Sequence, residues 1–322
     1  MLARVAETLY WMARYLERAE NMARLINVNA NLILDIPKKT AVGWEPLIDI
    51  TGTRKVFEEN YTNFEERSVM KYLIQDADSP VSILNSLKWA RENARTIRDV
   101  IPREAWEQIN SLNLYAKDQL NIAMSKRGRF SYLNEIILRN QTIVGLLSGT
   151  LSRDDGYVFV RLGRNLERAD MTSRIIDVRS ASLLVGDPGV EGHRPFENIQ
   201  WMSVLKSLTA YQMYRQAMQA RVRRSDVVKF LFQSQRFPRA ILFCVQQIRQ
   251  SLKGLPDGEG TMERVNKLEE LLKAAQLHTY DQQMLHDFID VIQIELNAIN
   301  NSLVEHYFLS GREAFELQKQ AS

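Results

Sequence analysis

The sequence is poor in cysteine and contains no long apolar run. Its one cysteine, Cys244, excludes an intramolecular disulfide and fits a reducing compartment. No apolar stretch is long enough to span a bilayer. Glu7, Glu17 and Glu20 interrupt the amino-terminal segment, where transit peptides have few acidic residues. We therefore expect a cytoplasmic protein that does not cross a membrane and whose first residues form a structural helix.

Residues that interrupt helices are also scarce. Only 14 glycines and 8 prolines occur in the 322 residues, so long regular segments must form most of the chain. Apolar residues recur at three- and four-residue spacing from Leu9 to Ile26, and no convincing segment alternates with the period of a strand. The sequence therefore predicts an all-α helical bundle of about ten or more helices.

Several helix boundaries follow from prolines and capping residues. The first helix is expected over residues 3–36, because Pro37 cannot continue it. Ser79 and Pro80 resemble an N-cap and a first helical residue, and Lys126 to Arg129 is expected to be a basic turn. Other expected helices cover residues 45–57, 66–75, 102–124, 130–150, 152–184, 196–218, 226–232, 238–253, 262–277 and 280–309, with a break at 186–189 and a frayed tail after Gly311.

Common motifs for cofactor binding and catalysis are missing. The net charge of +3 argues against general binding of nucleic acid. The four histidines form no His-x-x-x-His or Glu-x-x-His pair, which argues against a metal site, and no glycine-rich phosphate loop occurs. We therefore expect no cofactor and no metal, and we expect Cys244 to be a buried thiol.

Two segments of the chain match each other in order. Residues 14–26 match residues 164–176, with seven of thirteen positions identical at an offset of 150. A second set of identities follows at an offset of 158, and it includes Pro80 with Pro238. These matches predict two diverged tandem helical repeats, residues 1–150 and 151–322, packed together as one domain.

Each predicted repeat opens with a Leu-Glu-Arg-Ala motif on a helix. Adjacent helical residues point about 100° apart, so Glu17 and Arg18 do not pair readily with each other. We predict instead that Glu17 pairs with Arg168 and that Glu167 pairs with Arg18, because charges beside a core require partners. The complete candidate polar cluster is Arg14, Glu17, Arg18, Arg164, Glu167 and Arg168.

Two interpretations of this cluster remain open. It is either a buried salt-bridge network that fixes the two repeats, or a polar pocket in which arginines hold a carboxylate or phosphate and a glutamate acts as base. A second candidate surface binds an anion or a partner, with Trp106 packed over it; exposed charge is its simpler explanation. It comprises Asn93, Arg95, Arg98 and Arg239.

The chain resembles the alpha-E domain family, bacterial all-helical proteins named for a Glu-Arg motif. The resemblance rests on Leu9-Tyr10-Trp11, on the two Leu-Glu-Arg-Ala segments, on residues 92–95 with Arg98 and Trp106, and on Phe237-Pro238-Arg239. It extends over nearly the whole chain. Ala13 stands where the second motif has Gly163, and Ala240 replaces a serine that the family pattern leads us to expect.

The resemblance implies a context of amide-bond formation. Alpha-E proteins look like companions, encoded alongside, of circularly permuted ATP-grasp ligases and transglutaminase-like proteins. The preferred hypothesis is a non-catalytic helical accessory subunit that binds the ligase or its peptide substrate. The alternative is an enzyme that acts on peptide or amino-acid carboxylates through the paired arginines and glutamates, and a purely architectural homo-oligomer is a third possibility.

Overall fold

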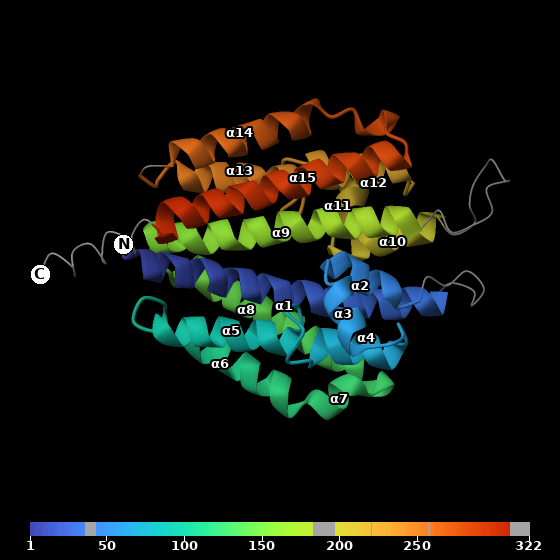
Figure 1. Ribbon diagram of the computed structural model, residues 1–322, viewed down its shortest axis with the longest axis horizontal. Coiled ribbons are helices and arrows are strands. Elements are labelled where there is room, and N and C mark those ends of the chain that lie inside the picture. Colours follow the sequence, from blue (N-terminus) through green and yellow to red (C-terminus); the bar gives the residue numbers. More distant parts are fainter. Residues whose placement is uncertain (36–42, 183–196, 220, 257, 310–322) are drawn as a thin grey trace, which may run out of the picture.

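A computed structural model describes residues 1–35, 43–182, 197–219, 221–256 and 258–309. Every regular element within these ranges is helical and none is a strand, so the predicted all-α class is confirmed. The expected break at residues 186–189 and the tail after Gly311 lie outside the described residues. Figure 1 shows the long helices lying roughly side by side, with α1 and α9 in the middle of the molecule.

Two long helices form the centre of the structure. Helix α1 spans Ala3–Asp35 and α9 spans Asp155–Ser182, and they run beside each other in the same direction (Figure 1). Gly163 of α9 allows a close approach, because a Cβ at this position would lie 2.3 Å from the carbonyl oxygen of Tyr10. The helices can therefore bring their motif side chains into direct contact.

Each central helix belongs to its own four-helix bundle. Helix α1 contacts α5 and α8, and both of these contact α6, while α9 contacts α13 and α15, and both of these contact α14. The two bundles form the lower and upper layers of Figure 1 and meet mainly along α1 and α9. The outer helices are α5 (Ile83–Thr96), α6 (Arg103–Asp118), α8 (Lys126–Thr150), α13 (Ile241–Leu252), α14 (Glu259–Ala274) and α15 (Gln282–Leu303).

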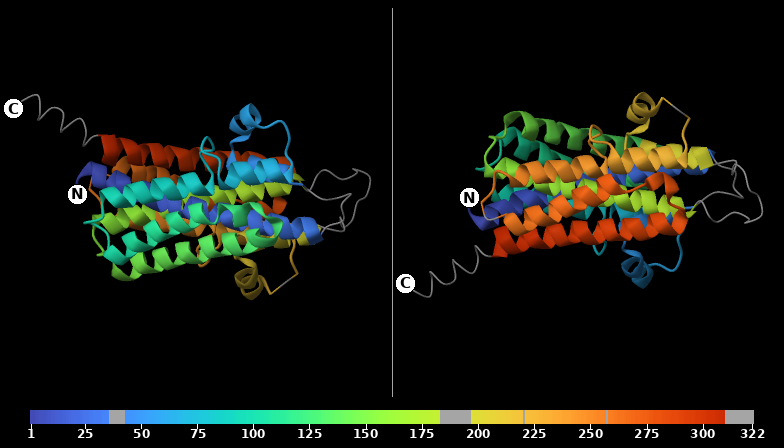
Figure 2. Two further views of the ribbon diagram at one scale, coloured as in Figure 1. Left: turned by 90° about the horizontal axis from the view of Figure 1, so that it is seen from below. Right: turned by 90° about the horizontal axis from the view of Figure 1, so that it is seen from above.

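Shorter helices connect the long ones. Figure 2 shows α3 and α11 projecting from opposite sides of the molecule. A π-helical segment, η2, extends α15 at its carboxyl end. The short elements are α2 (Glu45–Thr51), α3 (Arg54–Asn60), α4 (Glu66–Ile74), α7 (Leu120–Met124), α10 (Glu197–Ser207), α11 (Tyr211–Met218), α12 (Arg224–Gln233), η1 (Leu277–Thr279) and η2 (Val304–Leu309).

Three segments predicted as single helices are each divided in two. Gly52 ends α2 with φ of 68°, a conformation that glycine adopts without strain. Thr209 separates α10 from α11 with φ of 52°, which is unusual for a β-branched residue. Gln119 separates α6 from α7. Gly52 is a helix-breaking signal that the sequence offered, whereas residue type gives no such signal at Thr209 or Gln119.

Two predicted helix starts are wrong by a few residues. Helix α5 begins at Ile83, and the hydroxyl of Ser82, not Ser79, accepts the hydrogen bond from the Asn85 amide at 3.2 Å. Residues 126–129, predicted as a turn, form the first turn of α8, because the hydroxyl of Ser125 caps that helix. Ser79 and Ser82 lie three residues apart and serine is a good N-cap, so residue type alone does not choose between them.

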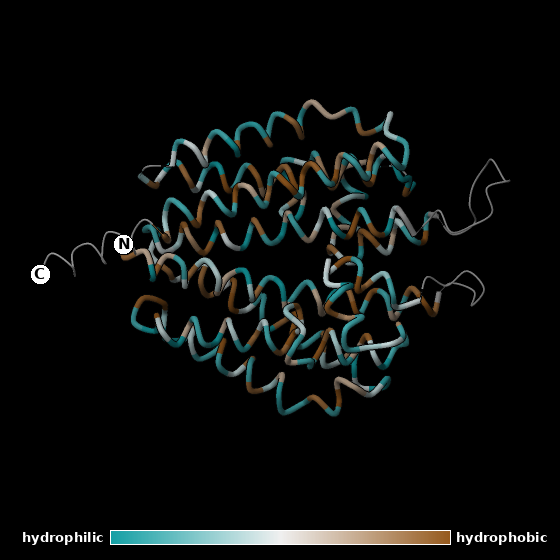
Figure 3. Tube along the Cα trace, viewed as in Figure 1, coloured by the Kyte–Doolittle hydropathy of each residue, from teal (hydrophilic) through white to brown (hydrophobic). Residues whose placement is uncertain are grey.

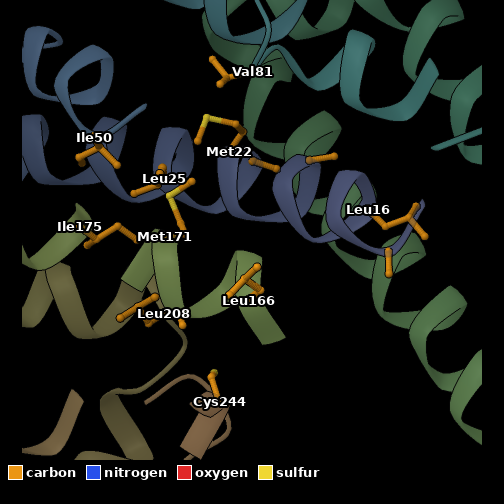
Figure 4. Close-up of a cluster of buried hydrophobic side chains, with 14 of the residues drawn as sticks. Leu16, Met22, Leu25, Ile50, Val81, Leu166, Met171, Ile175, Leu208 and Cys244 are labelled. Atoms are coloured by element: carbon orange, nitrogen blue, oxygen red, sulfur yellow. The ribbon is translucent and has the colours of Figure 1, made fainter. Parts of the chain in front are cut away.

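A continuous apolar core fills both layers. Polar and apolar stretches alternate along the helices in Figure 3, as expected for amphipathic segments. Figure 4 shows Leu25 of α1 beside Met171 of α9, and both side chains are buried. Cys244 is free and buried, which confirms the predicted thiol environment. No helix within the described ranges is both long and apolar enough to span a bilayer.

Candidate functional site

The motif side chains of α1 and α9 meet between the two bundles. Leu16 and Ala19 of α1 are buried in the protein core, as are Leu166 and Ala169 of α9. The charged residues flank these apolar positions, so the close contact of the helices brings them face to face. The carboxylates become almost completely buried, with Glu17 and Glu167 each 2% exposed.

Glu167 of α9 is held by two arginines of α1. Arg18 donates from Nε to Oε1 at 2.6 Å and from Nη2 to Oε2 at 2.9 Å, the paired geometry that guanidinium and carboxylate groups favour. Arg14 donates from Nε to Oε2 at 2.8 Å. Burial opposes ionisation of Glu167, but the two guanidinium groups outweigh it and lower its pKa to about 2.

Glu17 of α1 is held in a similar way from the other side. Arg168 donates from Nε to Oε1 at 2.9 Å and from Nη2 to Oε2 at 2.7 Å, and Arg239 donates from Nη1 to Oε1 at 2.7 Å. Burial opposes ionisation, yet these arginines hold the pKa of Glu17 far below its ordinary value. The predicted pairs Glu17 with Arg168 and Glu167 with Arg18 are therefore both confirmed.

Arg239 belongs to this buried group and not to the surface predicted for it. It lies just before α13 and is 8% exposed. Its guanidinium binds Glu20 at 2.8 Å and Asn21 at 2.8 Å in addition to Glu17. Its grouping with Asn93, Arg95 and Arg98 is thus corrected. The hydroxyl of Thr172 in α9 donates to the backbone carbonyl of Arg239 at 3.0 Å, which holds this residue beside the two central helices.

Asn93, Arg95 and Arg98 lie near the carboxyl end of α5. Arg95 and Arg98 are exposed, and Arg95 donates to Glu92 at 2.9 Å. Neighbouring Arg91 binds Glu92 and lies 5.7 Å from the centre of the Trp106 ring. The location is a solvated helix end, where Glu92 pairs with Arg91 and Arg95.

Two members of the central group were missed from the sequence. Glu20 accepts from Arg24 at 2.7 Å, four residues further along α1, and both side chains are largely buried. Glu20 follows the Leu-Glu-Arg-Ala motif directly, and Arg24 is one of the residues identical in the repeat match. These two signals could have identified the pair. We call the following set the central network: Arg14, Glu17, Arg18, Glu20, Arg24, Arg164, Glu167, Arg168 and Arg239.

Arg164 differs from the other arginines of the central network. Its Nε is buried without a hydrogen-bond partner, and its guanidinium makes no hydrogen bond or ion pair with any described residue. Burial and the nearby charge of Arg168 lower its pKa. It lines a pocket of about 10 Å³ where α1, α8 and α9 meet, together with Glu17, Ser148 and Tyr157. This pocket has room for about one water-sized group.

Two other places could hold a ligand. Asp177 of α9 lies 2.8 Å from Nδ1 of His286, whose Nε2 lies 3.7 Å from Asp290, so three possible ion ligands gather there. Asp177 comes from another part of the chain, which is why no spacing motif indicated this group. A larger groove of about 1340 Å³ lies beside α14 and α15, with charged residues of both signs, including Lys267 and Glu295. Those two are themselves paired at 2.7 Å.

The fold and the central network define an all-helical protein whose two bundles are joined through paired glutamates and arginines. The chain belongs to the Alpha-E family: the model of this family, described as a predicted alpha-helical domain with a conserved ER motif, matches residues 1–308. Glu17 with Arg18 and Glu167 with Arg168 are the two Glu-Arg pairs of this kind in α1 and α9.

Longer bacterial proteins are also similar to this chain. An uncharacterized protein of Mycobacterium bovis is 21% identical over 291 residues, which cover 83% of this chain and 31% of that protein. An uncharacterized protein of Mycobacterium tuberculosis strain H37Rv is 20% identical over the same shares. The chain therefore spans about a third of the length of these relatives. No solved structure matches it.

Proposed function

We propose that this chain is a non-catalytic helical accessory subunit that binds an ATP-grasp-type peptide ligase or the peptide substrate of that ligase. The observation that carries the proposal is the state of the motif carboxylates. Glu17 and Glu167 are buried, and two arginines hold each of them ionised with a lowered pKa. A carboxylate with so low a pKa is a weak base at neutral pH, so this arrangement favours a structural role.

The relatives support a role beside another protein or domain. In the two mycobacterial proteins the matched region accounts for only 31% of the chain, so most of each protein is something else. A helical region joined to a larger part of the same protein is consistent with an accessory role. The identity of the partner as an ATP-grasp ligase, with a transglutaminase-like protein as a second partner, rests on the family resemblance.

We also propose that the two bundles are diverged copies, residues 1–150 and 151–322. The order of contacts supports this: α1, α5, α6 and α8 follow one another around the first bundle as α9, α13, α14 and α15 do around the second. The ion pairs between α1 and α9 also support this proposal, because the glutamate of each motif pairs with an arginine of the other motif. The central network then holds the two copies together.

The experiment mixes the purified chain with the purified ATP-grasp ligase from the same organism. We expect a complex by size-exclusion chromatography, ATP-dependent ligation only when the ligase is present, and no turnover by the chain alone. Glu167→Gln, checked for folding by circular dichroism, is compared with Glu92→Gln, a change at an exposed pair on α5. Absence of a complex would refute binding to the ligase, and absence of any effect of the chain on ligation as well would refute the accessory role.

The same experiment separates the enzymatic alternative. If Glu167→Gln folds and still binds the ligase but abolishes ligation, the motif takes part in chemistry or substrate binding. If Glu167→Gln lowers binding and thermal stability together, the motif acts through the architecture. If Glu92→Gln supports ligation as well as the unmodified chain does, a loss of ligation or binding in Glu167→Gln results from the change in the central network.

A further inference from the structure

Arg14 and Arg164 occupy matching places in the two motifs but have different surroundings. Arg14 donates to Glu167 at 2.8 Å and to Oδ1 of Asn300 at 2.8 Å, and it lies 3.4 Å from the hydroxyl of Tyr10. Arg164 has none of these partners, and its Nε is buried and unsatisfied. A buried N–H group without an acceptor is unfavourable, so an acceptor is missing at Nε of Arg164 and not at Nε of Arg14.

Arg14 and Arg164 differ because Arg239 binds Glu17 where Arg164 would otherwise bind it. By analogy with Arg14 and Glu167, Arg164 would be expected to bind Glu17, but Arg168 and Arg239 already satisfy both oxygens of that carboxylate. In the sequence match, Val81 stands at the position of Arg239, so the first half supplies no such competitor for Glu167. Arg239 therefore releases Arg164 from the internal pairing.

The charges around Arg164 favour an anion. The central network contains three carboxylates and six arginines, and Arg161 also lines the pocket beside Arg164. Glu17 forms part of the pocket wall, but its charge is more than balanced by Arg168 and Arg239. Burial is the main cause that lowers the pKa of Arg164, and the charges of Arg168 and Arg161 act in the same direction while Glu17 opposes them.

We propose that Arg164 is a binding site for a carboxylate. The pocket has a volume of about 10 Å³, which admits one oxygen-sized atom and excludes a whole phosphate group. Ser148 and Tyr157 also line the pocket, and the Arg164 side chain is only partly covered. One carboxylate oxygen enters beside Nε while the other faces the outer guanidinium nitrogen, a two-point arrangement typical of arginine. The site goes beyond the accessory role and stands without it, because the chain alone can be tested.

The test measures the thermal unfolding midpoint of the full chain while sodium acetate is added at constant ionic strength. We expect a rise of about 2 °C at about ten times the dissociation constant, and a further rise with the logarithm of the acetate concentration. Acetamide, which has nearly the same shape without charge, should give no rise. Arg164→Gln should abolish the response, and Arg95→Gln, which removes an exposed arginine on α5, should retain it.

A second variant protects the test against misfolding. Ser148→Leu places a larger side chain on the pocket wall and leaves every arginine in place, so it should abolish the acetate response in a folded protein. A response to acetate that persists in Arg164→Gln, or that acetamide reproduces, would overturn the proposal. A larger response to chloride than to acetate, lost in Arg164→Gln, would assign the site to a monatomic anion and overturn the carboxylate assignment.

Discussion

Gly163 of α9 lies directly against the backbone carbonyl of Tyr10 in α1. A Cβ on Gly163 would come within 2.3 Å of that oxygen and 3.1 Å of the carbonyl carbon. Backbone atoms cannot move aside as the end of a long side chain can. The separation of the central helices, and with it the geometry of every pair between the two motifs, therefore depends on the missing side chain at this position.

Replacing this glycine should therefore destabilise the protein. We expect Gly163→Ala to reduce the free energy of unfolding by about 1–3 kcal/mol, because α9 must shift away from α1. The matched control is Gly149→Ala in α8, where an added Cβ meets nothing within 4 Å. That change should leave stability unchanged or raise it by up to about 1 kcal/mol through helix propensity. Urea unfolding measures both, and equal stabilities would contradict the close-contact argument.

Local helical geometry made much of this architecture predictable. The spacing of apolar and charged residues along α1 and α9 predicted both helices, and the match between the two motifs was also needed to predict the pairing of Glu17 with Arg168. Arg239 was assigned wrongly because it lies 222 residues from Glu17, and no periodicity connects two residues so far apart. The break at Thr209 was equally hidden, since only tertiary contacts hold a threonine at positive φ.

Removal of one buried carboxylate should be strongly destabilising. Glu167→Gln leaves Arg14 and Arg18 without their shared charge, and breaking a buried pair in this way costs about 3–5 kcal/mol. Urea unfolding should show this loss, whereas Glu92→Gln at the surface of α5 should leave the unfolding midpoint almost unchanged. If the two variants unfold alike, the central network does not hold the bundles together.

The buried thiol offers a probe of the same region. Burial raises the pKa of Cys244 to about 12, so almost no reactive thiolate exists at neutral pH in the folded protein. We expect no reaction with a thiol-specific disulfide reagent under native conditions and one equivalent after unfolding in urea. Ser152→Cys adds an exposed thiol and should react at once with one equivalent. Rapid reaction of Cys244 itself would mean that the core around α13 opens easily.

The lowered pKa of Glu167 should make stability depend on acid. Its pKa is lowered from 4.5 to about 2 on folding, so the unfolded chain binds this proton more readily than the folded protein does. The stabilising contribution is thus fully present above the unfolded pKa and is lost as the pH falls toward the folded value. One carboxylate with this shift contributes about 3 kcal/mol, and Glu17 acts in the same direction.

Urea unfolding at a series of pH values measures this dependence. The free energy of unfolding of the unmodified chain should fall steadily as the pH decreases from 4.5 toward 2. Glu167→Gln starts from a lower stability but should show a shallower fall, because it has lost one of the titrating groups. Parallel curves for the two proteins would mean that Glu167 has an ordinary pKa in the folded state. The arginines around it would then hold the helices by contact and hydrogen bonding without selecting the charged carboxylate.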